Sequence, residues 1–265
     1  MQTLIEENIV EKFQEQGYVI IRDFFSTEEM NDLIEEISST KPRHGSSCLT
    51  KGTMTFYSEV FFNNQKIQNF ISQQKIVDFL KQFIGPDFWV RWDQAVAKRP
   101  GSGIFPWHQD NGYSRLKDEY YQLWISLTDG TPENGGLWLV PGSHKEFLPH
   151  KEVENHVTYD GTPDNPISIQ TKAGDIVLFS SLMLHKTTPN ITQGTRWAYV
   201  IEYMSLNHLD PTVDAPYFVV ARDGKSHPEF VQSYPGQFNL INQIKYLDVR
   251  LKQLKYFLFE RHQKN

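Results

Sequence analysis

Apolar residues recur at helical spacing in the first third of the chain. The pattern predicts helices over residues 3–16 and 66–83, and Ser26 with Glu29 forms a capping box that opens a third helix, ending near residue 38. The polar stretch 41–55 predicts a loop. The part of the chain before residue 88 is therefore expected to be mainly helical.

Short β-prone runs alternate with turns rich in Gly, Pro and Asn beyond residue 88. Predicted strands cover residues 88–97, 105–111, 120–128, 136–140, 167–170, 175–180 and 196–204. This spacing is typical of an antiparallel sandwich or barrel. No linker divides the chain, which predicts one domain over 1–265: a helical part at about 1–85, a strand core at about 88–204, and a loop and helix at about 205–265.

The C-terminal segment returns to helical spacing. Its apolar residues recur at intervals near 3.5, at Leu240, Ile241, Ile244, Leu247, Leu251, Leu254 and Leu258. Such a stripe predicts an amphipathic helix that packs on the outside of the barrel or pairs with a second copy of the chain. The protein is thus expected to be a monomer or a homodimer through this helix.

Composition excludes several classes of protein. Of 265 residues, 39% are hydrophobic and 14% aromatic, enough for a large core, and the net charge of −6 argues against nucleic acid or an anionic membrane as a partner. The lone Cys48 excludes a disulfide scaffold and a cysteine-based metal centre. The acidic N-terminus has no signal-peptide or membrane-spanning pattern, so we expect a cytoplasmic protein.

His108 and Asp110 are two residues apart in a predicted strand, so their side chains are expected on one face. His185 follows another predicted strand and is the best third ligand. Two imidazoles and one carboxylate are the donor set of non-haem Fe(II) oxygenases. A His-x-Asp pair alone is more often a surface turn or an ion pair, so the rest of the pattern matters.

Arg196 opens the next predicted strand, eleven residues after His185. Alternation places it on one face with Ala198 and Val200, which would leave room in a barrel interior. An arginine there can bind a carboxylate through two parallel hydrogen bonds. The alternative for Arg196 alone is a surface ion pair.

Taken together, the motifs resemble the phytanoyl-CoA dioxygenase family of Fe(II)/2-oxoglutarate-dependent oxygenases. The matching pieces are Gly17–Ile20, Lys98–Pro100, Trp107–Asp110, Trp124–Leu127, Glu133–Leu137, Pro141–His144, Ala173–Asp175, His185–Asn190 and Arg196. Each piece is common, but their order and spacing are specific. The resemblance implies a mainly β protein with flanking helices and a double-stranded β-helix (jelly-roll) core.

The resemblance also assigns roles by position. It implies that His108, Asp110 and His185 bind Fe(II), that Arg196 binds the distal carboxylate of 2-oxoglutarate, and that Gln94, Trp124 and Thr187 contact this cosubstrate. With O2, the implied reaction hydroxylates an aliphatic C–H through a ferryl species and releases succinate and CO2. Asp110 argues against halogenation, because family halogenases have a small residue there.

The substrate is expected to be a small metabolite. Residues expected to contact it are Trp92, Trp107, Asn111, Tyr113, Ser126 and Met183. No basic cluster near the motif suits the phosphates of coenzyme A. The loops 41–55 and 145–166 are expected to act as lids. Two alternatives are an iron-dependent jelly-roll epoxidase or isomerase that does not use 2-oxoglutarate, and a non-catalytic metal-binding scaffold.

Overall fold

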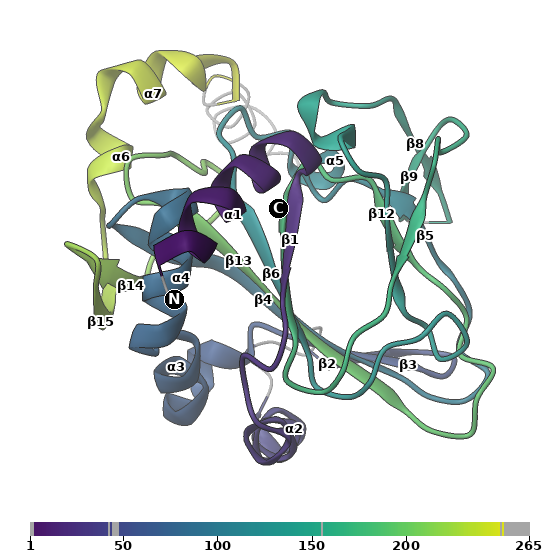
Figure 1. The fold of residues 1–265 in the computed structure, drawn as a ribbon. Coiled ribbons are helices and arrows are strands. Elements are labelled where there is room, and N and C mark those ends of the chain that lie inside the picture. The colour runs from purple at the N-terminus through teal and green to yellow at the C-terminus, as the bar shows by residue number, and fades with distance from the viewer. Residues whose placement is uncertain (1–2, 42, 44–47, 155, 250, 252–265) are drawn as a thin grey trace, which may run out of the picture.

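Two antiparallel sheets face each other in the computed structural model, which describes residues 3–41, 43, 48–154, 156–249 and 251 (Figure 1). The larger sheet has the order β1-β11-β6-β13-β4-β14-β15, with β3 beside β4 and β2 beside β3. Its strands are β1 (Tyr18–Ile21), β2 (Cys48–Lys51), β3 (Met54–Ser58), β4 (Phe88–Lys98), β6 (Tyr121–Ser126), β11 (Ile176–Ser180), β13 (Arg196–Ser205), β14 (Tyr217–Arg222) and β15 (Lys225–Val231).

The smaller sheet has the order β10-β7-β12-β5 and lies opposite the larger one. Its strands are β5 (Phe105–His108), β7 (Leu137–Leu139), β10 (Ile167–Ile169) and β12 (His185–Thr187). A hairpin of β8 (His150–Val153) and β9 (His156–Tyr159) lies beside β5. The antiparallel two-sheet arrangement predicted from the strand pattern is confirmed, as is the jelly-roll core implied by the resemblance. Every predicted strand is present to within three residues at each end.

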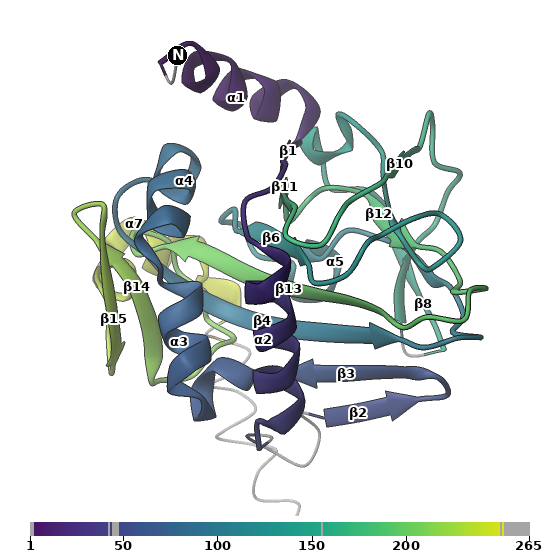
Figure 2. The same ribbon diagram turned by 60° about the horizontal axis from the view of Figure 1, so that its bottom comes forward.

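Helices cover the outer face of the larger sheet (Figure 2). The helices are α1 (Thr3–Gln16), α2 (Thr27–Ser39), α3 (Gln65–Ile71), α4 (Gln74–Ile84), α5 (Asn111–Ser114), α6 (Pro235–Phe238) and α7 (Leu240–Lys245), with 3₁₀ turns η1 (Val60–Asn63) and η2 (Ser143–Lys145). Apolar residues of α1 to α4 form one core with β4, β6, β11 and β13. The predicted capping box of α2 is confirmed, and the predicted helix 66–83 is two helices.

Strand alternation explains how one sheet has two different faces. Tyr199, Ile201 and Tyr203 of β13 are fully buried in the core under the helices. Val200 and Glu202, between them, point to the space between the sheets. The faces that the sequence pattern predicts for β6 and β13 are therefore those of the structure.

Three predictions about connecting segments are wrong. The expected loop 41–55 contains β2 and the start of β3, the expected loop 145–166 contains the β8–β9 hairpin, and the expected loop after residue 205 contains β14 and β15. The strands β2 and β15 form hairpins with β3 and β14, and β3 also pairs with the distant β4. Pairing of this kind makes strands of segments whose polar composition predicts a loop.

The C-terminal helix does not pack through its apolar stripe. Side chains of Leu240, Ile241 and Ile244 are 65–74% exposed. The residues turned to the body are Asn242 and Tyr246, whose hydroxyl accepts hydrogen bonds from the backbone N–H of 117 and 118. The expected packing of the stripe on the barrel is thus wrong for the described residues; Leu254 and Leu258 lie outside them.

Candidate active site

His108 and His185 face each other across two neighbouring strands. Antiparallel pairing of β5 with β12 sets the two residues opposite one another, with ring centroids 4.1 Å apart. In each ring Nδ1 lies 2.9 Å from a backbone carbonyl, that of Pro106 for His108 and that of Met183 for His185. Because a carbonyl only accepts, Nδ1 carries the proton and each Nε2 presents a lone pair.

Asp110 completes this cluster from a turn. β5 ends at His108, and Asp110 has helical backbone angles at the start of α5. Its carboxylate oxygens lie 3.3 Å from His108 Nε2 and 3.7 Å from His185 Nε2. His108 and Asp110 therefore converge through a turn, whereas the sequence predicted both on one strand.

The three side chains form a donor set that fits a divalent iron. One ligand atom from each lies within 4.8 Å of the others, and in the described part of the chain no other cluster of three such groups meets this criterion. Burial, together with the neighbouring His108, lowers the pKa of His185 to about 4, so its ring is neutral near pH 7. Burial would raise the pKa of Asp110, but the two histidines and Arg91 outweigh it and the pKa is lowered.

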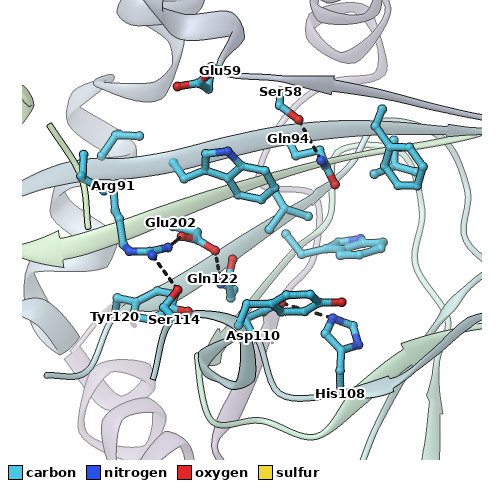
Figure 3. Close-up of a pocket in the computed structure, with 18 of the residues that line it drawn as sticks. Ser58, Glu59, Arg91, Gln94, His108, Asp110, Ser114, Tyr120, Gln122 and Glu202 are labelled. Carbon is cyan, nitrogen blue, oxygen red and sulfur yellow. Dashed lines mark hydrogen bonds and ion pairs between the residues drawn. The ribbon is translucent and has the colours of Figure 1, made fainter. Parts of the chain in front are cut away.

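A cavity of about 810 Å³ lies between the sheets and contains this cluster. His108 and Asp110 project into it beside residues of β4, β6 and β13 (Figure 3). Of the residues predicted to contact cosubstrate or substrate, Gln94, Trp124, Thr187, Arg196, Trp92 and Tyr113 line the cavity. Gln94 donates to Ser58 Oγ at 2.8 Å.

Arg196 is buried at the end of the cavity formed by the start of β13. Its Nε and Nη1 have no hydrogen-bond partner among the described residues, and its guanidinium carbon lies 5.3 Å from the ring centroid of Trp124. Burial lowers the pKa of Arg196 to about 9, so it remains a cation at neutral pH. A buried, unpaired guanidinium suits a carboxylate ligand.

Lys98 is a second cation at this end, directly opposite Arg196 in the β4–β13 pairing. It is fully buried, and its Nζ donates to Thr187 Oγ1 at 3.0 Å and to the Thr188 carbonyl. Burial and the charge of Arg196 lower its pKa to about 7. Gly135, at positive φ, leaves room for the lysine stem, since a Cβ there would lie 2.7 Å from Lys98 Cδ. A lysine at a strand end is usually solvated, so the burial of Lys98 was not expected from the sequence.

Four residues expected at the substrate lie outside the cavity lining. Ser126 Oγ donates to Thr171, and the Asn111 amide bonds to the backbone of residue 116, which holds the turn after α5. Met183 is part of the core between the sheets, and Trp107 lies on the β5 side that contacts Lys186. Their side chains are thus used for packing and turn formation.

Sequence reasoning missed Arg91. The β4–β13 register shifts between Glu202 and Tyr203, so Arg91 is an extra residue in β4. Such a bulge re-aims side chains, and both Arg91 and Trp92 line the cavity. Strict alternation would have turned Arg91 toward the helices.

Comparison with known proteins agrees with this architecture. The family model of phytanoyl-CoA dioxygenase (PhyH) matches residues 13–198. The ectoine dioxygenase of Stutzerimonas stutzeri is 26% identical, with 94% of this chain and 88% of that protein covered. The methylphosphonate hydroxylase of Gimesia maris is 27% identical over 79% of this chain and 85% of its own.

Solved structures show the same fold. The apo non-heme monooxygenase ThoJ has a TM-score of 0.71 at 19% identity, over 93% of this chain and 97% of its own. The α-ketoglutarate-dependent epimerase SnoN has a TM-score of 0.67 at 17% identity, over 86% and 97%. Among the described residues, no helix has the length and apolarity to cross a membrane. The chain belongs to the phytanoyl-CoA dioxygenase family and is an Fe(II)/2-oxoglutarate-dependent dioxygenase.

Proposed function

We propose that this enzyme hydroxylates an aliphatic C–H of a small metabolite, with release of succinate and CO2. His108, Asp110 and His185 would hold Fe(II), and Arg196 with Lys98 would hold the distal carboxylate of 2-oxoglutarate. The observation that carries the proposal is that the three ligand groups and the unpaired guanidinium share one cavity.

Bound Fe(II) with 2-oxoglutarate supplies the oxidation of the C–H bond by O2. The chain's own groups prepare this site. The backbone carbonyls of Pro106 and Met183 fix both histidines in the tautomer whose Nε2 points to the metal position. Arg196 orients the cosubstrate by its far end, and Trp124 packs beside that guanidinium.

The two alternatives from the sequence are not favoured. An iron enzyme without 2-oxoglutarate leaves the buried Arg196 and Lys98 without an anion, and a non-catalytic scaffold leaves the complete donor set without a role. Relatives are named as dioxygenases or hydroxylases of ectoine, methylphosphonate and phytanoyl-CoA. Hydroxylation of a small molecule is the reaction that agrees both with these names and with the residues of the site.

An anaerobic titration tests the proposal. Fe(II) and then 2-oxoglutarate are added to the purified protein, and the visible charge-transfer band of the chelate is recorded. We expect a band in the wild type, no band in His185→Ala, and at least ~30-fold weaker 2-oxoglutarate binding in Arg196→Ala, because a buried charge-assisted pair is worth about 2 kcal/mol or more.

Matched controls come from the exposed β14–β15 hairpin. His227 and Arg222 pair with Glu229 near the surface, so His227→Ala and Arg222→Ala are expected to titrate like the wild type. Bound iron without a band in the wild type would contradict the use of 2-oxoglutarate. A normal band in His185→Ala would contradict the ligand assignment.

A further inference from the structure

The cavity has two ends of opposite electrostatic character. Arg196 and Lys98 form one end, and Glu202 lies six residues further along β13, about 20 Å away at 3.3 Å per residue. Glu202 pairs in register with Gln122 of β6. Asp110 lies within electrostatic range of both Glu202 and Arg91. A molecule that contacts Glu202 or Gln122 thus lies on the substrate side of the metal ligands.

We call this second part the acidic end and define it by Trp89, Arg91, Trp92, Gln122 and Glu202, which all line the cavity. Figure 3 shows Glu202 hydrogen-bonded to Arg91 on one side and to Gln122 on the other, beside Asp110. Its charges do not cancel, because Arg91 is bonded to two buried carboxylates, those of Glu202 and Asp210. Counted with Asp210, which pairs with the same guanidinium, the acidic end has one more carboxylate than cation. Burial raises the pKa of Glu202, and the charge of Arg91 acts against that rise.

Arg91 is not available to an incoming anion. Its Nε donates to Asp210, its Nη1 to Glu202 and its Nη2 to Ser114 Oγ. Both carboxylates are almost completely buried, at 4% exposure for Glu202 and 1% for Asp210. To bind a carboxylate or phosphate, Arg91 would have to leave one of them unpaired inside the protein, which is strongly unfavourable.

Gln122 supplies an acceptor that no described residue satisfies. Its Nε2 donates to Glu202 Oε1 at 2.9 Å, so its Oε1 is turned away from that carboxylate. This oxygen is buried and has no hydrogen-bond partner within the described part of the chain. The Trp89 indole N–H is likewise buried without a hydrogen-bond partner among the described residues. It adds an uncharged donor to the acidic end. A buried acceptor of this kind is stabilised by a ligand that donates a hydrogen bond.

We propose that the acidic end binds a hydrogen-bond-donating group of the substrate, a hydroxyl, amide or ammonium, and rejects carboxylates and phosphates. The donor bonds to Gln122 Oε1 beside Glu202, and the indoles of Trp89 and Trp92 contact the apolar part of the molecule. This inference rests on the proposed function, since it assigns the cavity space beyond the cosubstrate to the substrate.

Three probes with one carbon skeleton test it: 4-phenylbutylamine, 4-phenylbutanamide and 4-phenylbutanoate. Each is titrated into the anaerobic complex with Fe(II) and 2-oxoglutarate, and the shift of the visible band is followed up to roughly 10 mM. We expect the amine or the amide to bind at least ~10-fold more tightly than the carboxylate. Quenching of tryptophan fluorescence in the metal-free protein gives a second reading, because Trp89, Trp92 and Trp124 line the cavity.

The variant Glu202→Gln keeps the shape of the end and removes its excess negative charge. It should reduce the ratio between the dissociation constant of the carboxylate and that of the amine or amide by roughly tenfold. The control Glu59→Gln makes the same chemical change in the same cavity, at a half-buried residue that pairs with Arg43 at 2.8 Å, and should leave the preference unchanged.

Two results would overturn the inference. One is a wild type that binds the carboxylate as tightly as the amide and the amine. The other is a wild type in which neither the amide nor the amine shifts the band or the fluorescence. A protein that forms no band with 2-oxoglutarate contradicts the proposed function instead, and the fluorescence titration still decides on the acidic end.

Discussion

The two faces of the larger sheet bury different chemistry on the same strands. Toward the helices, β6 and β13 bury aliphatic and aromatic side chains such as Leu123 and Ile201. Toward the smaller sheet the same strands bury Gln122, Arg196 and Glu202. Because the side-chain period of a strand is two, stability and ligand binding are assigned to alternate residues of one segment.

The two faces also differ in how their polar groups are satisfied. On the helix side, the buried carboxyl of Asp93 accepts from Tyr199 Oη at 2.5 Å and from the backbone N–H of Phe61 at 3.4 Å. On the cavity side, nitrogens of Arg196 and the carbonyl of Gln122 are buried without partners among the described residues. Asp93 Oδ1 is also buried without a partner among the described residues, so the helix side is not fully satisfied either. The difference is that the unpartnered groups on the cavity side belong to residues that line a space a ligand can enter.

The largest effect is expected from neighbouring truncations on opposite faces of β13. Ile201→Ala removes a fully buried side chain from the core under the helices and should lower the free energy of unfolding by about 2–5 kcal/mol. Val200→Ala, one residue away, widens a cavity that already exists and should cost about 1 kcal/mol. Urea unfolding of both variants measures the difference.

The same two variants should reverse their order in ligand binding. Folded Ile201→Ala is expected to bind Fe(II) and 2-oxoglutarate as the wild type does, because its side chain is on the far face of the sheet. Val200 lines the cavity, so its truncation should change 2-oxoglutarate affinity more. Equal losses of stability in the two variants would contradict the assignment of stability to one face of the sheet and of ligand binding to the other.

A smaller effect on stability is expected from Asp93, the carboxyl on the helix side. Burial raises its pKa to about 7, with Tyr199 and the backbone of Phe61 acting in the opposite direction. The unfolded chain loses this proton near pH 4, so between about pH 4 and 7 the native state holds one proton more. Stability should therefore fall as pH rises through this window, by up to about 1 kcal/mol per pH unit.

Asp93→Asn isolates this contribution. The amide does not titrate, so the difference in unfolding free energy between the variant and the wild type should shift in favour of the variant as pH rises. Urea unfolding at a series of pH values between about 4.5 and 7.5 measures it. A difference that does not change with pH would show that Asp93 is ionised in the native state.

Alternation also decides how much of the site could be predicted from the sequence. The faces of β6 and β13 follow a period of two over whole strands, so the positions of Trp124, Arg196 and Glu202 in the cavity were predictable. The bulge at Arg91 breaks the period, and no local signal marks it, because it arises from pairing with β13. Arg91, the cation of the acidic end, was therefore not predictable from the sequence.

The metal ligands were predicted through residue chemistry more than through geometry. His108 and Asp110 do converge, but through a turn in place of a shared strand. Trp107, Asn111, Ser126 and Met183 are adjacent in sequence to the ligands or the cavity strands, and yet their side chains serve packing and turns. Sequence proximity to a site says little about contact when neighbouring residues alternate between faces.

The smallest effect is expected on the cavity side, from Lys98. Its pKa is lowered to about 7 by burial and by Arg196, and a lysine is cationic below its pKa. In the free enzyme the cation is thus present near pH 6 and mostly lost near pH 8, so that 2-oxoglutarate binding must take up a proton at the higher pH. The dissociation constant should rise over this range by up to about tenfold.

Lys98→Met removes both the charge and its titration. With Fe(II) in excess, the anaerobic titration should show weaker 2-oxoglutarate binding than the wild type at pH 6 and a flatter dependence on pH. The approach of the two proteins toward each other near pH 8 distinguishes a charge effect from a defect in packing, which would weaken binding equally at every pH. A wild-type dependence that persists in Lys98→Met would assign the titration to another group and leave Arg196 as the cation that holds the cosubstrate.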